Sequence, residues 1–294
     1  MDFGYTCDNL RFWSAIALIV ILSLPIAAVP PPQQATPLSS QEQIQEEFAH
    51  VPCKSKERLN AVRTLFEKMG ASPEEISIEK VKDAENLVVT RKGTEPGKIV
   101  IGAHYDFVDE GCGAVDNWTG IVAIAHAYRS VRQLGAKKTV IFAAFGNEEK
   151  GLYGSKGMAL AIPTAEVPEY CAMINIDSFG LALPFAFKEV SSNKLTTVVE
   201  DRAAVMKIPF TKASIPYASA DSASFLVRRI PAVTLSGLSA DWASILHTNK
   251  DQVRAVNYTS VYLGYRLALA TWAAVDASPC DAYQEPAPSI LQKK

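Results

Sequence analysis

Residues 139–149 read Thr139-Val140-Ile141-Phe142-Ala143-Ala144-Phe145-Gly146-Asn147-Glu148-Glu149, a mostly apolar run of seven residues that leads to two adjacent carboxylates. An apolar run without alternation is typical of a strand buried on both faces, as in parallel sheets covered by helices. Acidic side chains directly after such a strand would lie at the edge where open α/β sheets place their sites. The stretch therefore predicts both an α/β fold and the position of a candidate site.

Helical periodicity and apolar runs alternate around this stretch. Amphipathic helices are expected at residues 55–69, 117–134, 152–162, 192–206 and 256–275. Further strands are expected at residues 86–90, 98–102, 171–176 and 232–235. The Gly- and Pro-containing turn at 93–97 predicts that the first two of these strands form a hairpin. Strands alternating with helices predict a three-layer helix/sheet/helix sandwich around a mixed, mainly parallel twisted sheet.

The composition suits one large domain. The chain has 294 residues, of which 48% are hydrophobic, and this is enough to bury a full core. No linker interrupts the pattern between residues 41 and 277, so we expect a single domain there, followed by a loose tail over residues 278–294. The formal net charge of −2 provides no electrostatic footprint for nucleic acid, so we expect no nucleic-acid partner.

The N-terminal part contains a nearly uncharged apolar segment at residues 12–29, followed by a Pro/Gln-rich spacer at residues 30–40. One interpretation is a signal peptide over residues 1–29 that is cleaved near the small residues Ala27 and Ala28. The segment is also long enough for an uncleaved membrane anchor, although Pro25 would disturb the helix. Both interpretations place the rest of the chain outside the cytoplasmic membrane, either secreted or periplasmic, or associated with the membrane.

The cysteines fit an oxidising compartment. One of the five, Cys7, precedes the apolar segment. The other four form an even set that suits disulfides, namely Cys53, Cys112, Cys171 and Cys280. Four cysteines allow three pairings, and the sequence does not choose among them. Our preference is a bridge from Cys53 to Cys112, which would tie an N-terminal helix to the loop before Asp116.

Five short segments contain side chains of the types that bind metal ions. The candidate metal ligands are His104, Asp116, Glu149, Asp177 and His247. His104, Glu149 and Asp177 come at or just after the ends of expected strands, so they should converge at one edge of the sheet. Glu148 is a spare carboxylate, and imidazole and carboxylate ligands with one free carboxylate are the inventory of a two-zinc hydrolase. Because adjacent side chains diverge, we assign Glu149 as a ligand and Glu148 as the general base.

Two further aspartates could support the histidine ligands. Asp106 lies two residues after His104, so the two side chains share a face if the strand continues, and the carboxylate can orient the imidazole. Asp251 follows His247 by four residues and could support it in the same way.

The order and local contexts of five motifs resemble those of the co-catalytic zinc peptidases, which include secreted bacterial leucyl aminopeptidases, glutamate carboxypeptidases and glutaminyl cyclases. The motifs are Gly-Ala-His-Tyr-Asp (102–106), Asp-Asn-Trp-Thr-Gly (116–120), Gly-Asn-Glu-Glu-Lys-Gly-Leu-Tyr-Gly-Ser (146–155), Asn-Ile-Asp-Ser-Phe-Gly (175–180) and His-Thr-Asn-Lys-Asp (247–251). The resemblance extends over about residues 85–274, which is most of the chain after the apolar segment.

The resemblance implies a site for two zinc ions that share one bridging carboxylate. The implied ligand sets are His104, Asp116 and Asp177 for one ion and Asp116, Glu149 and His247 for the other. Glu148 would be the base, as the residues themselves suggest. The resemblance also implies a cis peptide bond between Asp116 and Asn117.

The sequence departs from the family pattern near the substrate pocket. Some relatives have a tyrosine directly before the last histidine, where it can hydrogen-bond the oxyanion of the transition state, but this chain has Leu246. We assign that role to Tyr217, in the loop that precedes Asp221 and Ser222. Other relatives have Asp-His at these last two positions, so the resemblance does not define the substrate pocket.

The sequence thus favours a zinc-dependent aminopeptidase that acts outside the cytoplasm on peptides with a free N-terminus. A glutaminyl cyclase-like acyltransferase shares the fold but characteristically works with one zinc, and the complete set of five ligands argues against it. A non-catalytic, receptor-like zinc-binding domain would have a degraded site, and none of the five motifs is degraded. Carboxypeptidase action, the preference for the cleaved residue and the oligomeric state stay open.

Overall fold

The computed structural model describes residues 1–4, 36–215 and 219–285. The apolar segment at residues 12–29, for which we expect a signal peptide or an anchor, lies outside the described residues, and so does Tyr217. Within the described ranges, no helix has the length and apolar character needed to span a membrane.

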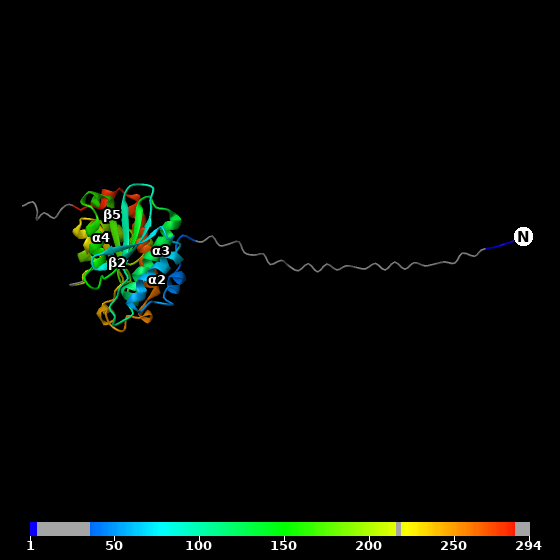
Figure 1. The fold of residues 1–294 in the computed structure, drawn as a ribbon, viewed down its shortest axis with the longest axis horizontal. Coiled ribbons are helices and arrows are strands. Elements are labelled where there is room, and N and C mark those ends of the chain that lie inside the picture. The colour runs from blue at the N-terminus through cyan, green and yellow to red at the C-terminus, as the bar shows by residue number, and fades with distance from the viewer. Residues whose placement is uncertain (5–35, 216–218, 286–294) are drawn as a thin grey trace, which may run out of the picture. The chain divides into compact units, whose positions relative to one another are not determined.

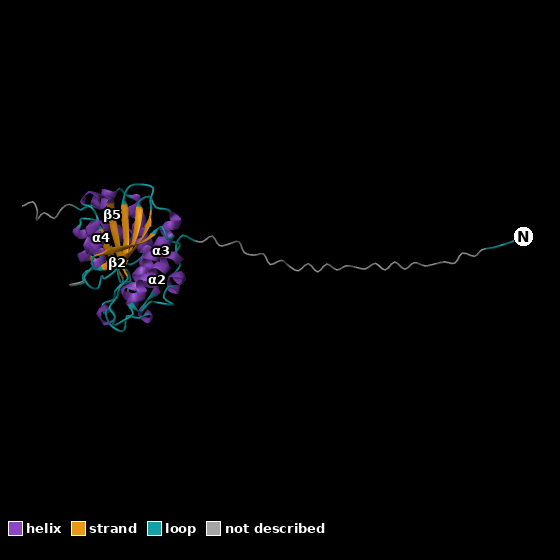
Figure 2. Cartoon of the chain, viewed as in Figure 1, coloured by secondary structure: helices purple, strands orange, loops and turns teal. Residues whose placement is uncertain are grey.

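A mixed sheet of eight strands forms the centre of the fold, with the order β1-β2-β4-β3-β5-β8-β6-β7. Figure 2 shows the strands in orange between the purple helices. The strands are β1 (Ile76–Val81), β2 (Ala84–Arg91), β3 (Lys98–His104), β4 (Thr139–Phe145), β5 (Tyr170–Ile176), β6 (Phe185–Phe187), β7 (Thr211–Ala213) and β8 (Ala232–Ser236). The central strands β4, β3, β5 and β8 run parallel, whereas β2 and β6 join them antiparallel. The predicted mixed, mainly parallel sheet is therefore confirmed.

Helices cover both faces of this sheet (Figures 1 and 2). The α-helices are α1 (Gln41–Glu46), α2 (Ser55–Lys68), α3 (Thr119–Leu134), α4 (Tyr153–Ala161), α5 (Asn193–Met206), α6 (Ser222–Val227) and α7 (Tyr258–Ala277). A short π-helical turn occurs at Ala114–Trp118. Short 3₁₀ helices occur at Thr164–Glu169, Lys188–Val190, Trp242–Ser244, Val253–Ala255 and Cys280–Tyr283. Helices α4 and α6 pack together on one face, and the others pack on the opposite face.

The double burial of the central strands explains their apolar sequences. In β3, Ile99 and Ile101 belong to the core shared with α3 and α7, whereas Val100 belongs to the core shared with α4. All three side chains are fully buried. A strand covered on both faces has no solvent-facing position, so its sequence is mostly apolar until the strand ends.

The predicted hairpin between residues 86–90 and 98–102 is wrong. Strand β4 lies between β2 and β3, pairing antiparallel with the first and parallel with the second. The intervening loop instead reaches the segment before β4, where the Glu95 amide donates to the Lys137 carbonyl. The true hairpin partner of β2 is β1, in which apolar and polar residues are mixed, so that it contains no apolar run to detect.

The described residues contain two disulfides, Cys53–Cys112 and Cys171–Cys280. The first confirms the bridge preferred from the sequence. The second ties β5 to the segment after α7, where Tyr283 is also buried. Residues 278–285, which the sequence assigns to a loose tail, are therefore attached to the domain, and residues 286–294 lie outside the described residues.

Replacing both Cys171 and Cys280 by alanine should lower the free energy of unfolding by roughly 2–5 kcal/mol, because the bridge closes a long loop. The two cysteines are separated by 109 residues in sequence. Urea unfolding, followed by circular dichroism without added thiol, measures the change. A midpoint equal to that of the wild-type protein would show that the bridge does not stabilise the domain.

Candidate active site

The carboxyl ends of three neighbouring parallel strands carry four of the predicted site residues. His104 is the last residue of β3, Glu148 and Glu149 follow β4, and Asp177 directly follows β5. Since parallel strands end at the same edge of the sheet, their side chains meet there. Asp116 reaches the same edge from the turn that precedes α3.

The structure brings the predicted ligands together. Three groups of side chains have potential ligand atoms that all lie within 4.8 Å of one another. These groups are His104, Glu148 and Glu149; His104, Asp116 and Asp177; and Asp116, Glu149 and His247. The last two groups are the ligand sets that the family resemblance implies. Asp116 belongs to both of them, so its carboxylate lies between two potential metal positions.

Asp116 is buried, and each of its carboxylate oxygens faces one imidazole. Its Oδ1 lies 3.2 Å from Nε2 of His104, and its Oδ2 lies 3.1 Å from Nε2 of His247. The peptide bond that follows it, to Asn117, is cis, as the resemblance implies. The Asn117 side chain donates to the Ile176 carbonyl at 2.9 Å, which connects the turn before α3 to the end of β5.

Ser178 is a site residue that the sequence analysis missed. Its buried hydroxyl lies 3.1 Å from Oδ1 of Asp116 and 3.0 Å from Oδ1 of Asp177, so it can donate to either carboxylate. Its place directly after Asp177 in the sequence was the available signal. A hydroxyl in this position helps to fix the mutual orientation of the two carboxylates.

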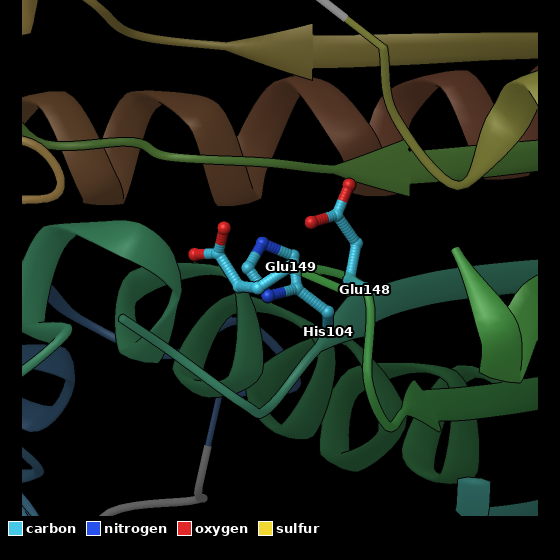
Figure 3. Close-up of side chains that lie close together, drawn as sticks. All are labelled: His104, Glu148 and Glu149. Carbon is cyan, nitrogen blue, oxygen red and sulfur yellow. The ribbon is translucent and has the colours of Figure 1, made fainter. Parts of the chain in front are cut away.

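The two adjacent glutamates point in different directions, as Figure 3 shows. The turn that carries them is fixed by Asp106, whose Oδ1 accepts the Glu148 amide at 3.0 Å and whose Oδ2 accepts the Glu149 amide at 3.2 Å. The backbone carbonyl of Asp106 also lies 3.1 Å from Nδ1 of His104. The predicted role of the Asp106 carboxylate is thus corrected: its Oδ1 lies 3.7 Å from Nδ1 of His104, and the carboxylate holds the amides of the two glutamates instead, while the backbone carbonyl contacts the imidazole.

Asp251 has a different contact from the one that the sequence predicts. Its Oδ1 accepts the Val115 amide at 2.7 Å and its Oδ2 accepts the Asp116 amide at 3.1 Å. It thus supports the loop that carries Asp116. The prediction that it supports the imidazole of His247 is wrong. The reason is a turn, because the Asp251 amide donates to the Thr248 carbonyl and the chain bends away from His247.

The electrostatics of the site reflect several carboxylates gathered around two imidazoles. Burial works to raise the pKa of Asp116, but its hydrogen bonds with His104 and His247 hold that pKa well below the usual range. Burial raises the pKa of Glu148 well above its usual range, and repulsion from Asp221 adds to this effect. Hydrogen bonds to Asp116 and Glu149 raise the pKa of His247 to about 10. The carboxylates therefore attract positive charge.

The same atoms fit a divalent cation. Oε1 of Glu149 is buried and has no hydrogen-bond partner within the described residues, while Oε2 lies 3.2 Å from Nε2 of His247. Leaving a buried carboxylate oxygen unpaired is costly. Metal binding would pair this oxygen, and the ion would take the place of protons on the imidazoles, since zinc binds neutral histidine and ionised carboxylates. The donor set therefore fits zinc.

A cavity of about 360 Å³ opens over these residues. One side of it is formed by the carboxylates and imidazoles described above. The other side is apolar and includes Phe187, Leu238, Trp242 and Leu246. Apart from Leu246, sequence analysis missed these apolar residues, because they come from short elements and loops that carry no periodic pattern. An apolar wall next to polar groups is typical of a small-molecule or side-chain pocket.

Comparisons with known proteins agree with this arrangement. A model of the family described as Peptidase family M28 matches residues 86–271, which is more than half of the chain. An aminopeptidase of Pseudomonas aeruginosa is 34% identical over 105 residues, which cover 35% of this chain and 19% of that protein. This chain aligns with only about a quarter of the length of the curated relatives that it matches.

Two solved structures show the likeness of the fold. The LapA aminopeptidase of Legionella pneumophila superposes with a TM-score of 0.69 and 22% identity, covering 81% of this chain and 71% of that chain. A glutaminyl cyclase from an Acidobacteriales bacterium superposes with a TM-score of 0.71 and 14% identity, covering 85% of this chain and 99% of that chain. Because the family model spans β3 to β8 and all five segments with predicted ligands, the chain belongs to peptidase family M28.

Proposed function

We propose that this protein is an extracytoplasmic zinc-dependent exopeptidase, an aminopeptidase that removes N-terminal residues from peptides. The observation that carries the proposal is the position of Asp116, which is shared by two potential ligand sets beside the half-buried Glu148. Membership of the M28 family and the similarity to an aminopeptidase of Pseudomonas aeruginosa support it. The two disulfides support a location outside the cytoplasm.

The proposed metal ligands divide into two sets. They are His104, Asp116 and Asp177 for one zinc ion, and Asp116, Glu149 and His247 for the other. When bound, two zinc ions polarise the scissile carbonyl and lower the pKa of a water molecule. The side chains of this protein hold the ions, and Ser178 and Asp106 fix the orientation of the ligands through the contacts described above.

Glu148 is the proposed general base. Its carboxylate takes a proton from the water that attacks the carbonyl carbon, and delivers it to the amine nitrogen as the carbon–nitrogen bond breaks. Burial raises the pKa of Glu148 above its usual range, which makes its carboxylate a stronger base towards the proton of water. Its side chain diverges from that of Glu149, so one glutamate can bind metal while the other stays free (Figure 3).

The charge of the cavity favours an aminopeptidase over a carboxypeptidase. Among its described lining residues there are four carboxylates and no lysine or arginine. A carboxypeptidase has to recognise the terminal carboxylate of its substrate, for which a cationic side chain is the usual partner. No such cation lies among the described lining residues, and the apolar wall suits an uncharged side chain on the N-terminal residue.

Tyr217 lies outside the described residues and stays our proposed stabiliser of the oxyanion. Ile215 and Ser219, which flank it at two positions' distance, both line the cavity. Leu246, which precedes His247, also lines the cavity but has no group that could donate a hydrogen bond.

Glutaminyl cyclisation is the second candidate function. The observation in its favour is the fold of the Acidobacteriales glutaminyl cyclase, 99% of which is covered by this chain. Zinc analysis, together with a panel of aminoacyl chromogenic substrates, N-terminally blocked peptides and a glutaminyl peptide, distinguishes the two functions. Two zinc ions and release of free N-terminal residues support the aminopeptidase, whereas one zinc ion and cyclisation of the glutaminyl peptide would replace it.

The variant Glu148→Gln should retain its zinc but lose turnover by about 10²–10⁴-fold, because the amide cannot accept the proton of water. Initial rates on the best aminoacyl substrate and zinc content by elemental analysis check the two halves of this prediction. Glu166→Gln is a matched control, since Glu166 lies away from the site in an ion pair with Lys98. A rate equal to that of the wild-type protein would remove Glu148 from the mechanism.

The variant His247→Ala should lose one zinc ion as well as activity, because only one of the two proposed ligand sets contains this histidine. Equilibrium dialysis followed by elemental analysis gives the zinc content per chain. The control is His50→Ala, which replaces an exposed histidine that does not line the cavity. Full zinc occupancy in His247→Ala would contradict its assignment as a ligand.

A further inference from the structure

Arg58, on α2, is a fully buried arginine that lies beside the loop leading to Asp116. Arginine is almost never fully buried unless its guanidinium has partners. Here the partners are backbone carbonyls. Nε donates to the Pro52 carbonyl at 2.6 Å, and Nη2 donates to the carbonyls of Cys112 and Gly113, the latter at 3.0 Å. The guanidinium therefore connects the start of the N-terminal helix to the active-site loop.

Two aromatic rings contact the guanidinium, one from a residue before the loop and one from a residue after it. Its central carbon lies 4.4 Å from the ring centroid of Phe107 and 5.1 Å from the ring of Trp118. Such cation–π contacts are strongest where water is excluded. Gly113 has a positive φ of 52°, and a side chain at this position would collide with Phe107. The loop thus packs tightly around Arg58, with little room to adopt another path.

A negatively charged side chain, Asp251, binds the backbone amides of the same loop. The Asp251 carboxylate accepts the amides of Val115 and Asp116, while the guanidinium binds two carbonyls just before them. Burial lowers the pKa of Arg58 to about 10, against the attraction of Asp251 and other carboxylates, so it keeps its charge at neutral pH. The loop is therefore held between a cation on its carbonyls and an anion on its amides.

We propose that Arg58 is a positioning residue for the metal centre, which sets the place of the Asp116 carboxylate by fixing the carbonyls of Cys112 and Gly113. This inference rests on the proposed zinc site. The Cys53–Cys112 disulfide joins the same two segments covalently, so the helix region and the loop are linked twice. A planar guanidinium is required, because one flat group donates to three carbonyls in fixed directions, which a lysine ammonium does not reproduce.

A distinctive consequence follows from the shared role of Asp116. Because this carboxylate belongs to both potential ligand sets, a change that loosens it should weaken both zinc sites together. Loss of His247 should instead affect one set. Residues that support metal ligands typically change metal affinity by about 10–100-fold when they are replaced. A merely structural role of Arg58 would lower the stability of the protein without this paired loss of affinity.

The test compares Arg58→Met and Arg58→Lys with Arg63→Met, a control on the same helix at a half-buried position. Competition with a chromogenic chelator gives both zinc affinities, and urea unfolding of zinc-free and zinc-saturated protein gives the stabilisation due to zinc. Arg58→Met should bind both ions at least tenfold more weakly, a loss of about 1.4 kcal/mol for each ion. Arg58→Lys should not restore the affinity, and Arg63→Met should match the wild-type protein.

Several results would overturn the inference. Equal destabilisation of the zinc-free and zinc-saturated Arg58→Met proteins, with unchanged zinc affinity, would make Arg58 merely structural. Full recovery in Arg58→Lys would show that the planar guanidinium is not needed. A wild-type protein that binds no zinc would reject the proposed function itself, which separates the two failures. If Arg58→Met does not fold, Phe107→Leu removes one supporting ring and should weaken both zinc sites in the same direction; unchanged affinity there would count against the inference.

Discussion

The carboxylate of Asp116, buried between two imidazoles, is the interaction on which the site depends. Its two oxygens face Nε2 of His104 and Nε2 of His247 at 3.2 Å and 3.1 Å. A buried anion needs compensating charge or hydrogen bonds, so the surrounding chain has to supply both. Asp251 holds its backbone amide and Ser178 contacts its side chain. The local chain path around residue 116 therefore serves one purpose, which is to present this carboxylate to both sides.

The parallel sheet makes such an arrangement possible, because the sheet itself brings residues from distant parts of the chain to one edge. Strand β3 lies between β4 and β5, and all three strands end at the same edge of the sheet. Their last residues or the residues just beyond them provide the histidine, the two glutamates and one aspartate of the site. Rigid strands fix these side chains more accurately than mobile loops would. The apolar cores on both faces thus determine where the polar chemistry can occur.

The sequence predicted the fold class and the residues at the strand ends, because buried strands have a strong local pattern and polar residues stand out where it stops. Several contacts between distant parts of the chain were not predictable. The loop at residues 93–97 has the composition of a hairpin turn, yet β4 enters between its two strands. The turn after His247 redirects Asp251 to another loop. Phe187 and Trp242 line the cavity from short segments with no periodicity.

The spread of the proposed ligands along the chain has a consequence for how the protein matures. One set is complete once the chain has folded through Asp177, but the other also needs His247, which arrives after β8. Metal sites are rarely formed in unfolded chains. A polypeptide that ends before β8 would therefore hold only one of the two proposed ligand sets, and the shared carboxylate of Asp116 would have its second partner only after the last third of the domain has folded.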